Sequence, residues 1–171
     1  MHLPCIGAVF GGAAIELAGR AIHPEYQANG IGAYMLHSYL TQHQDVTQLA
    51  TYTRNPSILR MIRTVAHTIY PINDDKQLEK IAQQMPHAQQ PQNDVVYHLD
   101  RYGPKGLFGH SDPADRPYFR NGIPLKKMYR NLQSVQSALI VTARIVPHLV
   151  QTHAQRAADI TKLAYNGEQH E

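Results

Sequence analysis

Residues 21–33 of this 171-residue chain read Ala-Ile-His-Pro-Glu-Tyr-Gln-Ala-Asn-Gly-Ile-Gly-Ala. The segment predicts the end of a strand, a glycine-containing turn and the start of a helix in immediate succession. A helix N-terminus presents backbone N–H groups without intrahelical partners, together with partial positive charge. Gly30 and Gly32 carry no side chain that would keep an anion at a distance. The segment therefore predicts a phosphate-binding loop.

The residues before this loop predict a β-hairpin. Ile6–Phe10 and Ala13–Leu17 are short apolar runs separated by Gly11 and Gly12. A dinucleotide-binding loop of the Rossmann type would have a third glycine where this chain has Met35, and it would follow a lone parallel strand. A P-loop would continue with Gly-Lys-Ser/Thr, which is missing here. The order hairpin, loop, helix therefore excludes both of these phosphate-binding classes.

The loop resembles that of a known family. Gln27-Ala28-Asn29-Gly30-Ile31-Gly32 matches the acyl-CoA loop pattern Gln/Arg-x-x-Gly-x-Gly/Ala of the GNAT family of N-acetyltransferases, and Pro24-Glu25-Tyr26 precedes it as in many family members. A second block agrees, because Leu49–Thr53 predicts a strand and Arg54-Asn55-Pro56 is similar to the family's Asn-Pro start of the following helix. The resemblance covers roughly residues 6–72, and the strand and helices that precede the hairpin in the family are missing.

This resemblance implies an α/β fold of the acyl-CoA N-acyltransferase type, with a mixed sheet flanked by helices. In the family, acyl-CoA lies in a cleft where two neighbouring parallel strands splay apart. The implied cofactor-binding residues are Ala21, Ile22 and His23 for the pantetheine arm, Gln27, Ala28, Asn29, Gly30, Ile31, Gly32 and Ala33 for the pyrophosphate, and Asn55. A helix cap explains Asn55 equally well.

Acetyl transfer to an amine requires a base, because only the neutral amine attacks the thioester. Glu16 is the candidate general base, and its alternative interpretation is a surface or salt-bridged glutamate. The positions of the family's thiolate-protonating tyrosine hold Ile62 and Arg63. Tyr52 and Tyr70 are the tyrosines considered in its place, and the acid stays unassigned.

Hydrophobic periodicity predicts the other elements of the first hundred residues. Gly30 to about His43 reads as a helix, and a second helix starts at Asn55, with Ile58, Leu59, Ile62, Val65 and Ala66 on its inward face. Residues 74–85 read as a short helix, residues 86–93 as a loop and residues 94–99 as a strand. We predict that residues 1–100 form an N-terminally shortened acyl-CoA-binding core.

Residues 101–171 are predicted to be an irregular connection followed by a helical C-terminal extension packed on the core. Turn-forming residues dominate 102–124, and residues 125–165 have helical composition, with Pro147 expected to kink or split the helix. The candidate buried positions are Leu132, Val135, Leu139, Val146, Leu149, Val150 and Ile160. Three roles stay open for this part: covering the sheet, forming a homodimer, or replacing the missing N-terminal elements.

The composition narrows the function classes. With 43% hydrophobic and 17% charged residues, the chain reads as globular, and neither a membrane-spanning run nor a signal peptide is recognised, so a cytoplasmic location is expected. The single Cys5 excludes an internal disulfide and a thiolate zinc site, and the histidine spacings fit no metal site, so no metal is expected. The net charge of +3 is scattered, which makes nucleic acid an unlikely partner.

These observations favour an N-acetyltransferase that transfers the acetyl group of acetyl-CoA directly to a primary amine of a small molecule or protein. One alternative is a non-catalytic acyl-CoA-binding or protein-interaction module. Another is a basic module that binds nucleic acid through Lys126, Lys127 and Arg130.

Overall fold

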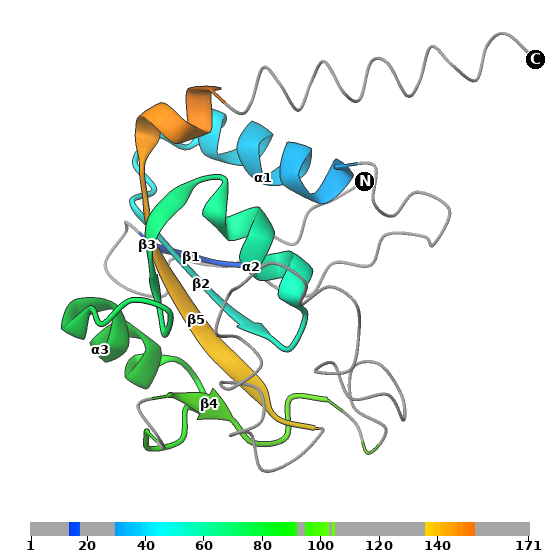
Figure 1. The fold of residues 1–171 in the computed structure, drawn as a ribbon, viewed down its shortest axis with the longest axis vertical. Helices are drawn as coiled ribbons and strands as arrows, with labels where there is room; N and C mark the ends of the chain where they lie inside the picture. Colours follow the sequence, from blue (N-terminus) through cyan, green and yellow to red (C-terminus); the bar gives the residue numbers. More distant parts are fainter. Residues whose placement is uncertain (1–13, 18–29, 92–94, 103, 105–135, 153–171) are drawn as a thin grey trace, which may run out of the picture.

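Within the residues that the computed structural model describes (14–17, 30–91, 95–102, 104 and 136–152), five strands form one mixed sheet. The elements are β1 (Ala14–Glu16), α1 (Ile31–Gln42), β2 (Gln48–Thr53), α2 (Pro56–Arg63), β3 (Ala66–Tyr70), α3 (Lys76–Gln84), β4 (Tyr97–His98) and β5 (Ala138–Ile145). Residues 147–152 are also helical. The predicted α/β class, a mixed sheet flanked by helices, is confirmed (Figure 1).

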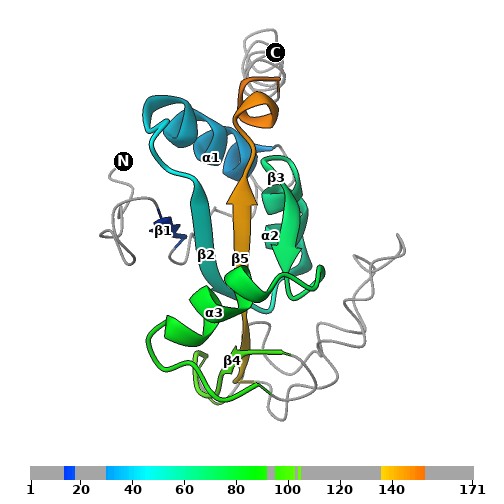
Figure 2. The same cartoon turned by 90° about the vertical axis from the view of Figure 1, so that its left-hand side faces the viewer.

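The strand at the centre of the sheet is β5. The strand order is β1-β2-β5-β3, and β4 also pairs with β5 (Figure 2). β1 and β2 are parallel neighbours, with Glu16 opposite Ala50, whereas β5 runs antiparallel to both β2 and β3. β2 and β3 therefore run in the same direction with β5 inserted between them.

The prediction of helix for residues 125–165 is wrong over 138–145, which form β5. All residues of this strand are buried except Arg144, so both of its faces are covered. A continuous apolar run has no period of two, and periodicity alone does not distinguish it from a buried helix. The β-branched residues Ile140, Val141 and Thr142 suit a strand. Pro147 does not kink a helix but begins the helical residues 147–152.

Helices α1 and α2 cover one face of the sheet (Figure 1). The side chains that form this half of the core include Leu36 and Leu40 of α1, Leu59 and Ile62 of α2, and Leu49, Leu139 and Val141 of the strands. The extent predicted for α1 is confirmed, since Gly30 and His43 are its caps. The helix predicted from Asn55 is too long, because α2 ends at Arg63 and Ala66 begins β3, a strand that was not predicted.

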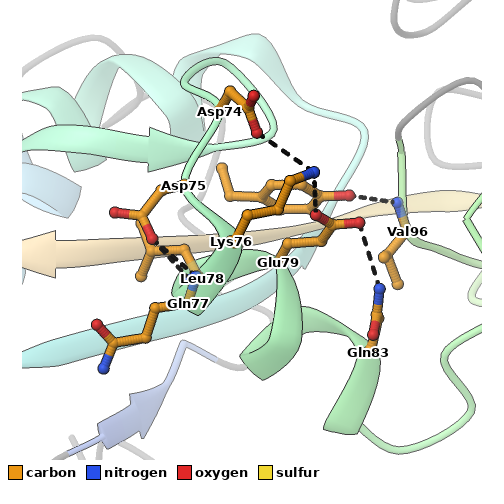
Figure 3. Close-up of polar contacts among 9 residues, drawn as sticks. Asp74, Asp75, Lys76, Gln77, Leu78, Glu79, Gln83 and Val96 are labelled. Atoms are coloured by element: carbon orange, nitrogen blue, oxygen red, sulfur yellow. Dashed lines mark hydrogen bonds and ion pairs between the residues drawn. The ribbon is translucent and has the colours of Figure 1, made fainter.

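Helix α3 covers the opposite face, where Leu78 and Ala82 pack against Ala50, Tyr70 and Ile140. Its start is fixed locally, as Figure 3 shows: Asp75 accepts hydrogen bonds from the backbone N–H groups of Gln77 and Leu78, both at 3.0 Å. The predicted helix over residues 74–85 is confirmed.

Several predicted features lie outside the described residues. They are the strand Ile6–Phe10, the hairpin turn Gly11-Gly12, most of the connection 102–124 and the extension after residue 152. The predicted strand 94–99 is shorter than expected, because β4 contains only Tyr97 and His98. The division into a core (1–100) and an extension (101–171) stays a prediction, but the central strand of the sheet comes from the second part.

Candidate functional site

The parallel pair β1–β2 is where the predicted loop residues and Glu16 belong. The chain leaves the carboxyl end of β1, passes through residues 18–30 and enters α1 before it returns as β2. Ligands of open α/β sheets bind outside the carboxyl ends of the strands. The described elements β1, α1 and β2 thus follow in the order strand, helix, parallel strand, and the predicted ligand-binding loop falls between the first two.

The hydrogen bonding between β1 and β2 changes at Leu17. Its N–H donates to the Ala50 carbonyl at 2.8 Å, as expected for a parallel ladder. The Leu17 carbonyl accepts from the hydroxyl of Thr51, also at 2.8 Å. In a continuing parallel ladder this carbonyl would accept from the backbone N–H of Tyr52. The carbonyl of Leu17, the last described residue after β1, is therefore bonded to the side-chain hydroxyl of Thr51.

Helix α1 starts at a glycine in the left-handed conformation. Gly30 has φ of 74° and is exposed, and a Cβ at this position would meet no atom of the described residues within 4 Å. Gly30 has no side chain to cap this helix, and the first turn of the helix has no acidic residue. The first turn of α1 itself therefore brings no carboxylate to the positive end of the helix dipole. Four of the predicted pyrophosphate-binding residues lie here: Gly30, Ile31, Gly32 and Ala33.

The other predicted loop residues cannot be placed, because Ala21, Ile22, His23, Gln27, Ala28 and Asn29 lie outside the described residues. Asn55 is the N-cap of α2, and its Oδ1 accepts a hydrogen bond from the N–H of Ser57 at 2.9 Å. Beside it, the buried Arg54 donates from a guanidinium nitrogen to the Ser137 carbonyl at 3.1 Å. Asn55 therefore has a structural contact of its own at the carboxyl end of β2.

Glu16, the predicted general base, is the last residue of β1 and is half-buried. Among the described residues, its carboxylate forms no ion pair and no side-chain hydrogen bond. It shares a face of the sheet with Ala50 and, two residues further along β2, with Tyr52. Tyr52, which carries an ionisable phenol, is therefore an aromatic neighbour of Glu16.

Tyr52 is the centre of a group of side chains that also includes Glu16, His98 and Arg101. Its hydroxyl donates to the Pro86 carbonyl at 2.7 Å. The pKa of Tyr52 is raised to about 12, chiefly by burial and then by the negative charge of Glu16, while the positive charge of Arg101 opposes the rise. The Arg101 guanidinium lies over the Tyr52 ring at 4.7 Å from its centre, and the His98 ring meets it edge-on at 5.4 Å. Tyr52 therefore stays protonated at neutral pH.

His98 contributes a neutral imidazole to the same group. Burial lowers its pKa below the ordinary value, the positive charges of His87 and Arg101 lower it further, and Asp100 acts in the opposite direction. Its Nδ1 accepts a hydrogen bond from the N–H of Asp100 at 3.2 Å. The neutral ring then carries its proton on Nε2 and presents a donor there.

Sequence reasoning missed His98 and Arg101. Tyr52 was considered as an acid only for its place in the chain. His98 ends the two-residue strand β4 and Arg101 follows it, and β4 pairs with β5 and not with β2. The period-two alternation along β2 is the one sequence signal available, since it puts Ala50 and Tyr52 on one face. Nothing in the sequence gives the strand order that brings Arg101 to that face.

Comparison with protein-family models, with curated proteins and with solved structures finds no match to this chain. Within the described ranges, no three side chains of His, Cys, Asp or Glu gather as a potential metal site. A search of the same residues finds no helix with the length and apolar character needed to cross a membrane.

Proposed function

We propose that this chain is an N-acetyltransferase of the acyl-CoA N-acyltransferase type, which transfers the acetyl group of acetyl-CoA directly to a primary amine. One observation carries the proposal: β1 and β2 are parallel neighbours, and the chain between them enters α1 through a left-handed glycine at which a Cβ would meet no atom of the described residues within 4 Å. This is the arrangement that the loop resemblance implies for an acyl-CoA cleft. The change of hydrogen bonding at Leu17 supports strands that part there.

In the proposed reaction, Gln27–Ala33 hold the pyrophosphate and Ala21–His23 pair with the pantetheine arm. Glu16 takes a proton from the acceptor ammonium, directly or through water. The neutral nitrogen then attacks the thioester carbonyl and the amide C–N bond forms. As the C–S bond breaks, the CoA sulfur leaves as a thiolate, and the nitrogen releases its second proton to solvent water. The unpaired state of the Glu16 carboxylate among the described residues supports this role.

Tyr52 is the better of the two tyrosines considered as the acid for the departing thiolate. Tyr70 is buried in β3, its hydroxyl accepts the N–H of Val96 at 2.9 Å, and β5 separates it from β2. Tyr52 lies beside Glu16 and is protonated at neutral pH, since its pKa is about 12. Its hydroxyl must leave the Pro86 carbonyl to serve as a donor.

The alternative is a non-catalytic acyl-CoA-binding module. It is favoured by the positions where the family places its acid: Ile62 is fully buried in the core, and Arg63 is an exposed cation. Neither side chain can protonate a thiolate at neutral pH in the way a tyrosine does. The two functions differ in whether thiol is released when an amine is added.

Calorimetric titration with acetyl-CoA tests the binding step. Gly30→Asp should abolish binding, because a carboxylate would stand at the start of α1 where pyrophosphate is proposed to lie. Gly30→Asn is the matched control, since asparagine tolerates the left-handed conformation and adds similar bulk without charge. Binding that is equal in the two variants, or no binding by the wild type, would contradict the proposal.

Thiol release with a panel of primary amines tests the chemical step. Glu16→Gln should lower turnover by about 10²- to 10⁴-fold, which is the usual contribution of a general base. The affinity for acetyl-CoA should stay unchanged, because glutamine keeps the size of the side chain. Unchanged turnover would remove Glu16 from the mechanism, and acetyl-CoA binding without any amine-dependent release would favour the non-catalytic module.

A further inference from the structure

Two oppositely charged side chains lie near Tyr52 without forming an ion pair. Glu16 lies on the same face of the sheet as Tyr52, because its partner Ala50 is two residues before Tyr52 in β2, and Arg101 lies over the Tyr52 ring. Among the described residues neither side chain has an ion-pair partner, whereas Arg144 pairs with Asp75 and Lys76 pairs with Asp74 and Glu79. The charges near Tyr52 are therefore available to a third group.

Arg101 makes a cation–π contact with the ring of Tyr52. Its guanidinium carbon stands 4.7 Å from the centre of the Tyr52 ring, a geometry in which the π face attracts the cation. The same ring is fixed by the hydrogen bond from its hydroxyl to the Pro86 carbonyl. The N–H groups of a guanidinium match a carboxylate in a bidentate arrangement.

We propose that the acceptor is an amine whose molecule also carries a carboxylate, such as an amino acid, with the amine at Glu16 and the carboxylate at Arg101. The inference rests on the proposed function and names its class of acceptor. A zwitterion would present its ammonium to the Glu16 carboxylate and its carboxylate to the Arg101 guanidinium, both of which lie near Tyr52. A polyamine would place its second ammonium against Arg101, and repulsion between like charges disfavours it.

Matched acceptors that differ in the carboxylate test this inference. Amino acids and their amides, and lysine with cadaverine, would be compared by kcat/KM from thiol release. The α-amine of an amide is less basic, so its neutral fraction at pH 7 is larger, and simple reactivity favours the amide. A preference for the acids of about ten-fold or more is expected, because a bidentate charge-assisted contact is lost in the amides.

Variants assign the preference to Arg101. Arg101→Ala should remove the preference for acids while leaving acetyl-CoA affinity unchanged, and Arg101→Lys should restore part of it. Lys80→Ala, which removes one exposed positive charge from α3, is the control and should keep the preference. Calorimetry with N-acetyl amino acids and their amides gives the same comparison without turnover.

The outcomes separate this inference from the proposed function. Four results would each overturn it. Two are an equal kcat/KM for acids and amides, and a preference for diamines. The others are no binding of either the N-acetyl amino acids or their amides, and an equal loss of kcat/KM for acids and amides in Arg101→Ala. Acetylation of neutral or dicationic amines would then leave the acetyltransferase proposal standing. Selective binding of N-acetyl amino acids by a chain that does not bind acetyl-CoA would instead support the carboxylate site and overturn the acetyltransferase.

Discussion

At the scale of single residues, local hydrogen bonds fix where the helices begin. Asn55 and Asp75 cap α2 and α3 through side-chain oxygens that accept backbone N–H groups, and Pro56 follows the first cap. Gly30 starts α1 in the left-handed conformation and without such a side-chain bond. Gly30 places no side chain at the start of α1, which suits the anion-binding role proposed for it.

Replacing Asp75 should destabilise the fold by removing a cap. Asp75→Ala loses the hydrogen bonds to Gln77 and Leu78, and such a loss costs about 1 kcal/mol in the free energy of unfolding. Urea unfolding measures the difference. Asp74→Ala is the matched control, because its exposed pair with Lys76 contributes about 0.5 kcal/mol or less. An equal effect of both variants would show that the cap does not stabilise α3.

The lowered pKa of His98 makes stability depend on pH. The unfolded chain binds a proton near the ordinary value of 6.5, whereas the folded chain binds it only at a lower pH. The contribution of His98 is therefore complete above 6.5 and is lost as the pH falls through the folded-state pKa. Between about pH 8 and about pH 5, the melting temperature of His98→Gln should fall less than that of the wild type.

The exposed His67 provides the control for this measurement. His67→Gln should follow the wild-type curve over the same pH range. If His98→Gln follows it as well, burial of the neutral His98 ring does not contribute to acid sensitivity.

At the scale of elements, capped and amphipathic segments were predictable and the central strand was not. The sequence predicted α1, β2 and α3 and the start of α2, because each has a cap, an apolar stripe or a short apolar run with turn residues beside it. The helix predicted over β5 was wrong because burial on both faces removes the alternation that identifies most strands. Interpreting apolar residues as a helical stripe also extended the predicted second helix to Ala66, the first residue of β3.

Leu139 and Ile140 should be equally sensitive to truncation. The two neighbours are completely buried and point to opposite faces, one packed in the α1–α2 side of the core and the other against α3. Leu139→Ala and Ile140→Ala should each cost about 2–5 kcal/mol, measured by urea unfolding. Arg144→Ala is the control in the same strand, because its side chain is exposed. Tolerance of either truncation would contradict a strand buried on both faces.

At the scale of the whole molecule, the sheet depends on residues distant in the chain. Among the described strands, β3 and β4 each pair with β5 alone, and so does one edge of β2. The Arg144–Asp75 ion pair and the Thr142 hydrogen bond to the Leu78 carbonyl also join β5 to α3. A core that ended at residue 100 would lack the strand that connects its two halves.

A fragment of residues 1–100 should therefore fail to fold. Without β5, the strands β2 and β3 lose their common neighbour and both halves of the core lose the side chains of that strand. Circular dichroism and amide exchange should show an unfolded chain, while residues 1–152, which keep every described element, should give a protected sheet. A folded 1–100 fragment would support the predicted boundary instead.

The sequence by itself determined the features that depend on a few neighbouring residues: the glycine start of α1, the caps at Asn55 and Asp75, and the apolar stripes that follow them. Only the tertiary structure decided that residues 138–145 lie between β2 and β3, and that Arg101 and His98 meet Tyr52. The reason is physical. Caps and turns satisfy backbone groups within one helical turn, whereas strand order and the site near Tyr52 arise from pairing and burial between segments far apart in the chain.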